Sequence, residues 1–228
     1  MIEHKLFPTL ICEDTYENPQ YFKKIFFDKM MDYVSETGYS EEDTGHVKMH
    51  LEPSYEPIYK FISEKAREYV NSLNVDANQF DFNIMKSWVN MTSVVNNNVH
   101  THAEAHITFT YYVHVPEHAK KILKVFAERP FMNEVFEGFL NNNVKEWNDK
   151  NSLSWKFLPK DGDIFIFPAR LRHSVESLNP GKFEPPVKTK NDLFLKRICI
   201  AGDILLTHKE LTTNPMGLQP IKNWKVFE

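Results

Sequence analysis

Glycine and cysteine are both scarce in this chain of 228 residues, which contains seven glycines and two cysteines. Such a low glycine count leaves nucleotide-binding motifs without support. The sequence also contains no phosphate-cradling glycine loop, no Gly-x-Ser-x-Gly and no Cys-x-x-Cys. Two cysteines, Cys12 and Cys199, are too few for a disulfide scaffold in a chain of this length. We therefore expect a protein that works in a reducing compartment.

Long apolar runs and an excess of positive charge are also missing. No uninterrupted apolar stretch approaches the ~18 residues that a membrane-spanning helix requires. The first residues, Met1–Lys5, carry no apolar signal core. The formal charge of −4 and the pI of about 6.2 give no global basic field that would hold a nucleic acid. We expect neither a nucleic-acid partner nor a membrane partner.

Aromatic residues, by contrast, are plentiful at 14%, including 18 phenylalanines, which favours strands and a well-filled interior. Apolar residues at helical spacing predict helices over 19–35 and 58–73, after a short edge strand within 6–12. From residue 80 onward the pattern changes to short β-type runs, the last of them at 193–206. Two helices followed by many short strands, without βαβ alternation, predict a mainly β fold with flanking helices.

The length predicts a single domain over 1–228. Within it we expect an N-terminal strand and helices (1–79) packed on a β core (80–206), followed by a C-terminal tail (207–228).

Two histidines separated by one residue, His100 and His102, precede a strand-like run that ends at Pro116. Side chains at i and i+2 of a strand point to the same face, so both imidazoles can be aimed at one point. Imidazole is a preferred ligand of iron, zinc, copper and nickel. His173, which follows the strand-like run 164–167, offers a third ligand, and we predict that the two stretches meet in a barrel and hold a metal.

Arg197 opens the last predicted strand. A guanidinium that faces a strand-rich interior is costly unless it meets an anion, and its planar fork suits a carboxylate. A metal together with a buried arginine is what a dicarboxylate such as 2-oxoglutarate would require.

The order of these motifs resembles the 2-oxoglutarate and iron(II)-dependent oxygenases, whose core is a double-stranded β-helix (jelly roll). It looks closest to a branch common in marine bacteria and their phages. The resemblance covers roughly 82–206. The matching segments are Trp88-Val89-Asn90, His100-Thr101-His102, Thr108-Phe109, Tyr112 to Pro116, Gly162-Asp163 to Pro168, His173-Ser174-Val175 and Arg197-Ile198-Cys199-Ile200.

The resemblance implies that iron(II) and O₂ act with 2-oxoglutarate as cosubstrate, which is decarboxylated to succinate while a substrate is hydroxylated. By position it implies His100 and His173 as iron ligands and Arg197 as the partner of the distal carboxylate of 2-oxoglutarate. Tyr112 and Asn90 are implied as further contacts of the cosubstrate. No separate side chain is assigned as a catalytic acid or base.

His102 departs from the wider superfamily, which usually has Asp or Glu at this position. Three alternatives remain open at the level of sequence. His102 completes a three-His site, Glu104 supplies a carboxylate, or the site is incomplete and the protein inactive. Two rival functions are also open: a cupin-like three-His metalloenzyme that does not use 2-oxoglutarate, and a non-catalytic binding module on the same fold.

The sequence does not name the substrate, which we expect to be a small molecule or a peptidyl group. We expect a cytoplasmic location, in the host cytoplasm for a phage-encoded protein.

Overall fold

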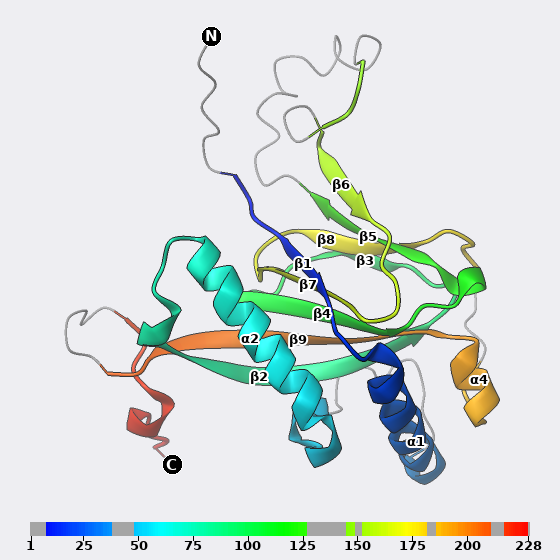
Figure 1. Ribbon diagram of the computed structural model, residues 1–228, viewed down its shortest axis with the longest axis horizontal. Coiled ribbons are helices and arrows are strands. Elements are labelled where there is room, and N and C mark those ends of the chain that lie inside the picture. The colour runs from blue at the N-terminus through cyan, green and yellow to red at the C-terminus, as the bar shows by residue number, and fades with distance from the viewer. Residues whose placement is uncertain are drawn as a thin grey trace.

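Two antiparallel β-sheets face each other in the computed structural model (Figure 1), which describes residues 8–37, 48–126, 145–148, 152–181, 186–210 and 217–227. The larger sheet has the order β1-β7-β4-β9-β2, with β1 at Cys12–Thr15, β2 at Phe80–Thr92, β4 at Ile107–His114, β7 at Asp163–Pro168 and β9 at Arg197–His208. The smaller sheet has the order β3-β8-β5-β6, with β3 at Asn97–His100, β5 at Lys121–Phe126, β6 at Ser154–Phe157 and β8 at His173–Ser177. This arrangement confirms the predicted jelly-roll core.

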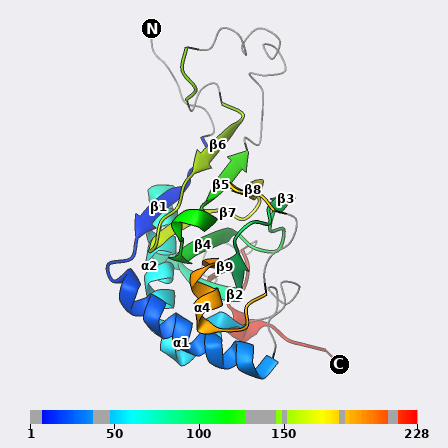
Figure 2. The same ribbon diagram turned by 90° about the vertical axis from the view of Figure 1, so that its right-hand side faces the viewer.

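Two long helices, α1 (Pro19–Thr37) and α2 (Glu56–Ser72), lie on the outer face of the larger sheet (Figures 1 and 2). Both were predicted to within two residues at each end. Apolar side chains four residues apart form one stripe along each helix, and this stripe packs on the sheet. The buried members are Phe22, Phe26 and Met30 on α1, and Ile58, Ile62, Ala66 and Val70 on α2.

The remaining helices are short. They are α4 (Lys190–Phe194) and the 3₁₀ helices η2 (Met49–Leu51), η3 (Pro53–Tyr55), η4 (Ala77–Gln79), η5 (Glu117–Ala119) and η6 (Ile221–Asn223). Among the helices of the described ranges, none is long and apolar enough to span a bilayer.

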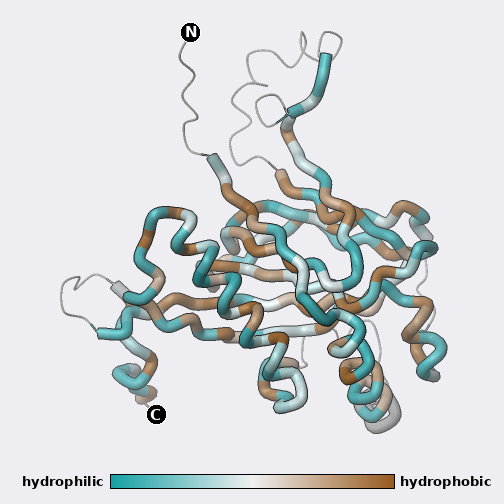
Figure 3. Tube along the Cα trace, in the orientation of Figure 1, coloured by the Kyte–Doolittle hydropathy of each residue, from teal (hydrophilic) through white to brown (hydrophobic). Residues whose placement is uncertain are grey.

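Strand β4 is buried along its whole length because it has protein on both faces. Successive side chains of a strand point to opposite faces. Phe109 and Tyr111 therefore join the core beneath the helices, whereas Tyr112 joins a second core between the two sheets. Hydrophobic residues dominate these central strands (Figure 3). Every position of β4 thus belongs either to the scaffold or to the space between the sheets.

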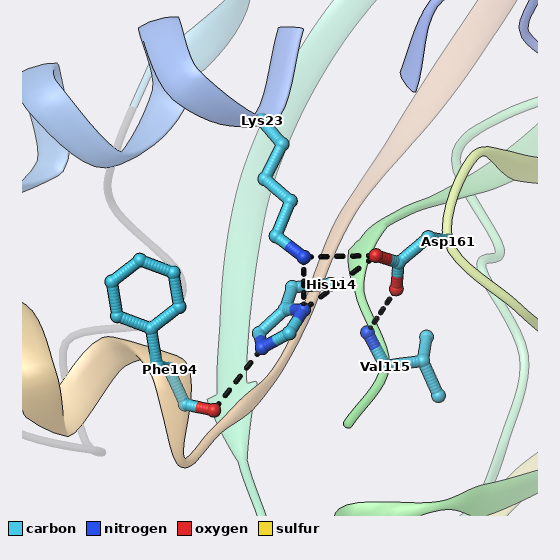
Figure 4. Close-up of polar contacts among 5 residues, drawn as sticks. All are labelled: Lys23, His114, Val115, Asp161 and Phe194. Carbon is cyan, nitrogen blue, oxygen red and sulfur yellow. Dashed lines mark hydrogen bonds and ion pairs between the residues drawn. The ribbon is translucent and has the colours of Figure 1, made fainter. Parts of the chain in front are cut away.

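A polar cluster of Lys23, His114 and Asp161 fastens the helices to one end of the larger sheet (Figure 4). Lys23 donates to His114 Nδ1 at 2.6 Å and to Asp161 Oδ2 at 2.9 Å, and Val115 N–H donates to Asp161 Oδ1 at 2.6 Å. His114 Nε2 donates to the carbonyl of Phe194 in α4 at 3.1 Å. Burial works to raise the pKa of Asp161, but the hydrogen bonds of this cluster outweigh it and hold the pKa well below its usual range.

Two predicted strands are placed differently in the structure. The first described strand occupies 12–15, whereas the sequence predicts an edge strand within 6–12, of which residues 6 and 7 lie outside the described part. The last strand begins at Arg197, because a capping box of Thr189 and Asp192 starts the helix α4 just before it. The expected start at 193 was therefore wrong.

Candidate metal centre

Three histidines converge at the rim between the two sheets. His100 is the last residue of β3, His173 is the first residue of β8, and the two are cross-strand partners whose ring centroids lie 4.3 Å apart. The ring of His102 lies 5.3 Å from that of His100 and 5.2 Å from that of His173. One ligand atom from each histidine lies within 4.8 Å of the other two. The structure thus brings together the three residues that the sequence singled out.

His102 reaches this cluster from a turn rather than from a strand. It follows the end of β3, and its backbone N–H donates to the carbonyl of Ala169 at 2.7 Å. Its ring stacks on Trp88 of β2 with a centroid distance of 5.5 Å and an interplanar angle of 24°. The convergence of His100 and His102 was predicted for the wrong reason, because β3 ends at His100 and contacts with the larger sheet orient His102.

The hydrogen bonds of the three rings fix their tautomers. Nδ1 of His100 lies 2.7 Å from the carbonyl oxygen of Asn98, and Nδ1 of His173 lies 2.8 Å from that of Leu171. A carbonyl oxygen only accepts, so each Nδ1 carries a proton, and in the neutral ring Nε2 then keeps its lone pair. In His102 the Nδ1–H points to the carboxylate of Asp203 at 2.6 Å, with the same consequence.

The protonation state of the cluster also suits a metal. Burial lowers the pKa of His173 to about 4, so its imidazole is neutral at physiological pH. The buried Nε2 of His102 has no hydrogen-bond partner among the described residues. Three imidazoles, one of them kept neutral by burial and another with a buried nitrogen that has no partner among the described residues, are a donor set that a first-row divalent metal such as iron(II) accepts.

Asp203 is the feature that sequence analysis did not assign to the site. It is fully buried on β9, and its Oδ1 accepts from His102 Nδ1 and from Thr108 Oγ1, the latter at 2.8 Å. Lys86 Nζ lies 3.2 Å from Oδ2. Burial works to raise the pKa of Asp203, but these hydrogen bonds dominate and lower it. The available signal was a carboxylate within the otherwise apolar run 198–206 of β9.

A cavity extends from the histidines into the space between the sheets. Its polar lining includes Asn90, Thr108, Thr110, Tyr112, Arg197 and Cys199. Arg197 is 1% exposed, and its guanidinium carbon lies 4.7 Å from the ring centroid of Tyr112. Its Nη1 donates to Cys199 Sγ at 3.6 Å, whereas Nε and Nη2 have no partner among the described residues. A buried cation with unused donors fits an anionic ligand in this cavity.

Tyr112 and Asn90 line the same cavity. Burial raises the pKa of Tyr112 to about 12, and its hydroxyl has no hydrogen-bond partner among the described residues. Asn90 lies across from Cys199 in the β2–β9 pair, with Nδ2 3.9 Å from Sγ. The two side chains are therefore placed to contact a ligand held by Arg197.

Glu104, the alternative carboxylate, is exposed and is not part of the histidine cluster. His106, His114 and His118 also lie outside the cluster. His106 and His118 are exposed, whereas His114 is 9% exposed and lies in the polar cluster of Figure 4.

Comparison with known proteins agrees with this geometry. Residues 86–182 match the model of a family described as "Putative 2OG-Fe(II) oxygenase". No curated protein matches the chain.

Several solved structures share the fold. One is the non-heme alpha ketoglutarate dependent carbocyclase SnoK from nogalamycin biosynthesis, with a TM-score of 0.54, 9% identity and coverage of 88% of this chain and 82% of that one. Another is AviO1 from Streptomyces viridochromogenes Tue57, with a TM-score of 0.50, 8% identity and coverage of 91% and 93%. At such identities the likeness concerns the fold alone.

Proposed function

We propose that this chain, whose residues 86–182 match the model of the 2OG-Fe(II) oxygenase family, hydroxylates a substrate with iron(II) held by His100, His102 and His173. The observation that carries the proposal is the state of the cluster. All three Nδ1 atoms are engaged by acceptors, which leaves three Nε2 atoms for one ion. Bound iron(II) supplies the oxidising chemistry, in which O₂ and 2-oxoglutarate are consumed and succinate and CO₂ are released.

The residues of the cavity orient the cosubstrate in this proposal. Arg197 binds the distal carboxylate through its unused Nε and Nη2, in a site where water does not screen the pair. Tyr112 and Asn90 donate hydrogen bonds to the same molecule. Phe167, which is buried between the sheets and lines the cavity, excludes water from this part of it. A cupin-like metalloenzyme without 2-oxoglutarate would leave the buried Arg197 without a role.

The substrate class and the location of the protein are proposed from the composition of the chain. The substrate is a small molecule or a peptidyl group, since the net charge of −4 does not favour nucleic acid. Both cysteines are free, which agrees with a cytoplasmic location.

The test is an anaerobic titration with iron(II) and then 2-oxoglutarate, monitored by the visible metal-to-ligand charge-transfer band. Wild type should develop the band, and His173→Ala should lose it, because the ion then lacks one of three ligands. The matched control is His118→Gln, which replaces an exposed histidine outside the cluster and should keep the band. Wild type that shows neither the band nor succinate formation in air would refute the proposal.

A further inference from the structure

One of the three histidines differs from the other two in what holds its Nδ1. His100 and His173 donate to backbone carbonyls, whereas His102 donates to the carboxylate of Asp203 at 2.6 Å. Asp203 is 0% exposed, so its charge acts in a low dielectric and is little screened. A full negative charge is thus hydrogen-bonded to one ligand of the proposed site.

Charge balance gives this contact a role. Iron sites of this general type usually combine two histidines with one carboxylate, which brings one negative charge to the ion. Three neutral imidazoles bring none. A carboxylate that accepts the second N–H of a ligating imidazole fixes its orientation and raises its basicity.

On the basis of the function proposed above, we propose that Asp203 is a positioning residue that supplies, through His102, the negative charge missing from the three-His site. The carboxylate of Asp203 does not touch the ion but hydrogen-bonds to a residue that does. Its negative charge makes Nε2 of His102 a stronger electron-pair donor to the iron.

Three neighbouring side chains affect the contact between Asp203 and His102. Thr108 Oγ1 donates to the same oxygen that accepts from His102, at 2.8 Å, and so competes for its charge. Lys86 Nζ approaches the other oxygen at 3.2 Å from a side chain that is half exposed. Trp88 stacks on His102 and limits rotation of the ring. Removing Asp203 and removing Thr108 should therefore change the basicity of His102 in opposite directions.

The decisive variant is Asp203→Asn, which keeps the shape and removes the charge. Under anaerobic conditions we expect iron(II) affinity to fall roughly 10- to 100-fold. We also expect the charge-transfer band of the complex with 2-oxoglutarate to move to shorter wavelength, because a less electron-rich iron(II) gives up an electron less readily. Thr108→Val should move the band to longer wavelength, because Asp203 then accepts more strongly from His102.

The matched control is Asp163→Asn. Asp163 is also a buried aspartate, 8% exposed, that accepts from a threonine hydroxyl, Thr15 Oγ1, at 3.0 Å, but it lies at the start of β7 and does not contact the histidines. This variant should leave iron affinity and band position as in wild type. Thermal unfolding of each variant separates a loss of fold from a loss of iron.

The outcomes separate the two proposals. A wild type without the band refutes the proposed function itself. A wild type with the band, together with an Asp203→Asn protein of unchanged affinity and band, overturns the role of Asp203. Where Asp203→Asn does not fold, Thr108→Val decides: a shift to longer wavelength supports the role, and an unshifted band overturns it.

Discussion

Replacing Arg197 by methionine should have effects of opposite sign on cosubstrate affinity and on the stability of the free protein. Arg197 is 1% exposed, and two of its three guanidinium nitrogens lack partners among the described residues. Removing one partner from a buried charge pair costs about 3–5 kcal/mol. At about 1.4 kcal/mol per factor of ten, 2-oxoglutarate should bind roughly 100- to 3,000-fold more weakly.

The free protein should respond differently, because no anion then offsets the cost of burying the guanidinium. The cation–π contact of the guanidinium with the ring of Tyr112, at 4.7 Å, offsets about 1–2 kcal/mol of that cost. Replacing a buried ion by an apolar side chain of similar size is often neutral or stabilising by about 1–4 kcal/mol. We therefore expect the unfolding free energy of free Arg197→Met to equal that of wild type or to exceed it by about 1–2 kcal/mol.

Thermal unfolding under anaerobic conditions with iron(II) measures both effects. With 2-oxoglutarate at 100 times the wild-type Kd, wild type should gain about 2.7 kcal/mol, and the variant about 0.4 kcal/mol or less. These gains correspond to Tm shifts of roughly 5–11 °C and at most about 1–2 °C. The matched control is Arg67→Met on α2, whose guanidinium donates to the carbonyl of Ala77 at 3.3 Å and packs on Phe82, far from the cavity.

Arg67→Met should keep the wild-type response to 2-oxoglutarate. If Arg197→Met also kept it, Arg197 would not bind the cosubstrate. If the free variant instead lost several kcal/mol of stability, the guanidinium would be a structural cation and the reasoning from its unused donors would be refuted.

Two further predictions concern the scaffold. Gly202→Ala places a Cβ 2.5 Å from Phe109 Cζ and 2.9 Å from the carbonyl oxygen of Lys86. The free energy of unfolding, followed by circular dichroism, should therefore fall by about 1–3 kcal/mol. An unchanged Tm would mean that the sheet adjusts freely. Asp161→Asn should cost roughly 1–3 kcal/mol at pH 7, since hydrogen bonds to the charged carboxylate are lost. Because the folded-state pKa of Asp161 is depressed, its contribution is fully present above the unfolded pKa of about 4, declines as pH falls below that value, and is lost only below the folded-state pKa. A gap between variant and wild type that does not shrink at all in urea titrations from pH 7 to pH 3 would contradict this assignment.

Sequence reasoning succeeded where the signal is local or repeated along the chain. The helices at 19–37 and 56–72 follow from apolar spacing, and the mainly β fold follows from the succession of short strands, whereas the jelly roll was implied by the resemblance to the oxygenases. The three histidines were identified from the order of a His-x-His pair, a distant His and a distant Arg, and from the resemblance that this order carries.

The errors arose where tertiary contacts decide. His102 is aimed by a backbone bond to Ala169 and by Trp88, neither of which a strand pattern contains. The contact between His102 and Asp203 joins residues 101 positions apart, so no spacing rule reveals it.

The histidine cluster draws its members from both layers of the fold. His100 and His173 belong to the smaller sheet, whereas His102 is tied to the larger one through Trp88 and Asp203. An ion bound by all three histidines would cross-link the two sheets at this edge. Loading the site should therefore slow amide hydrogen exchange along that rim, and chelation should let the two layers part there before the rest of the molecule opens.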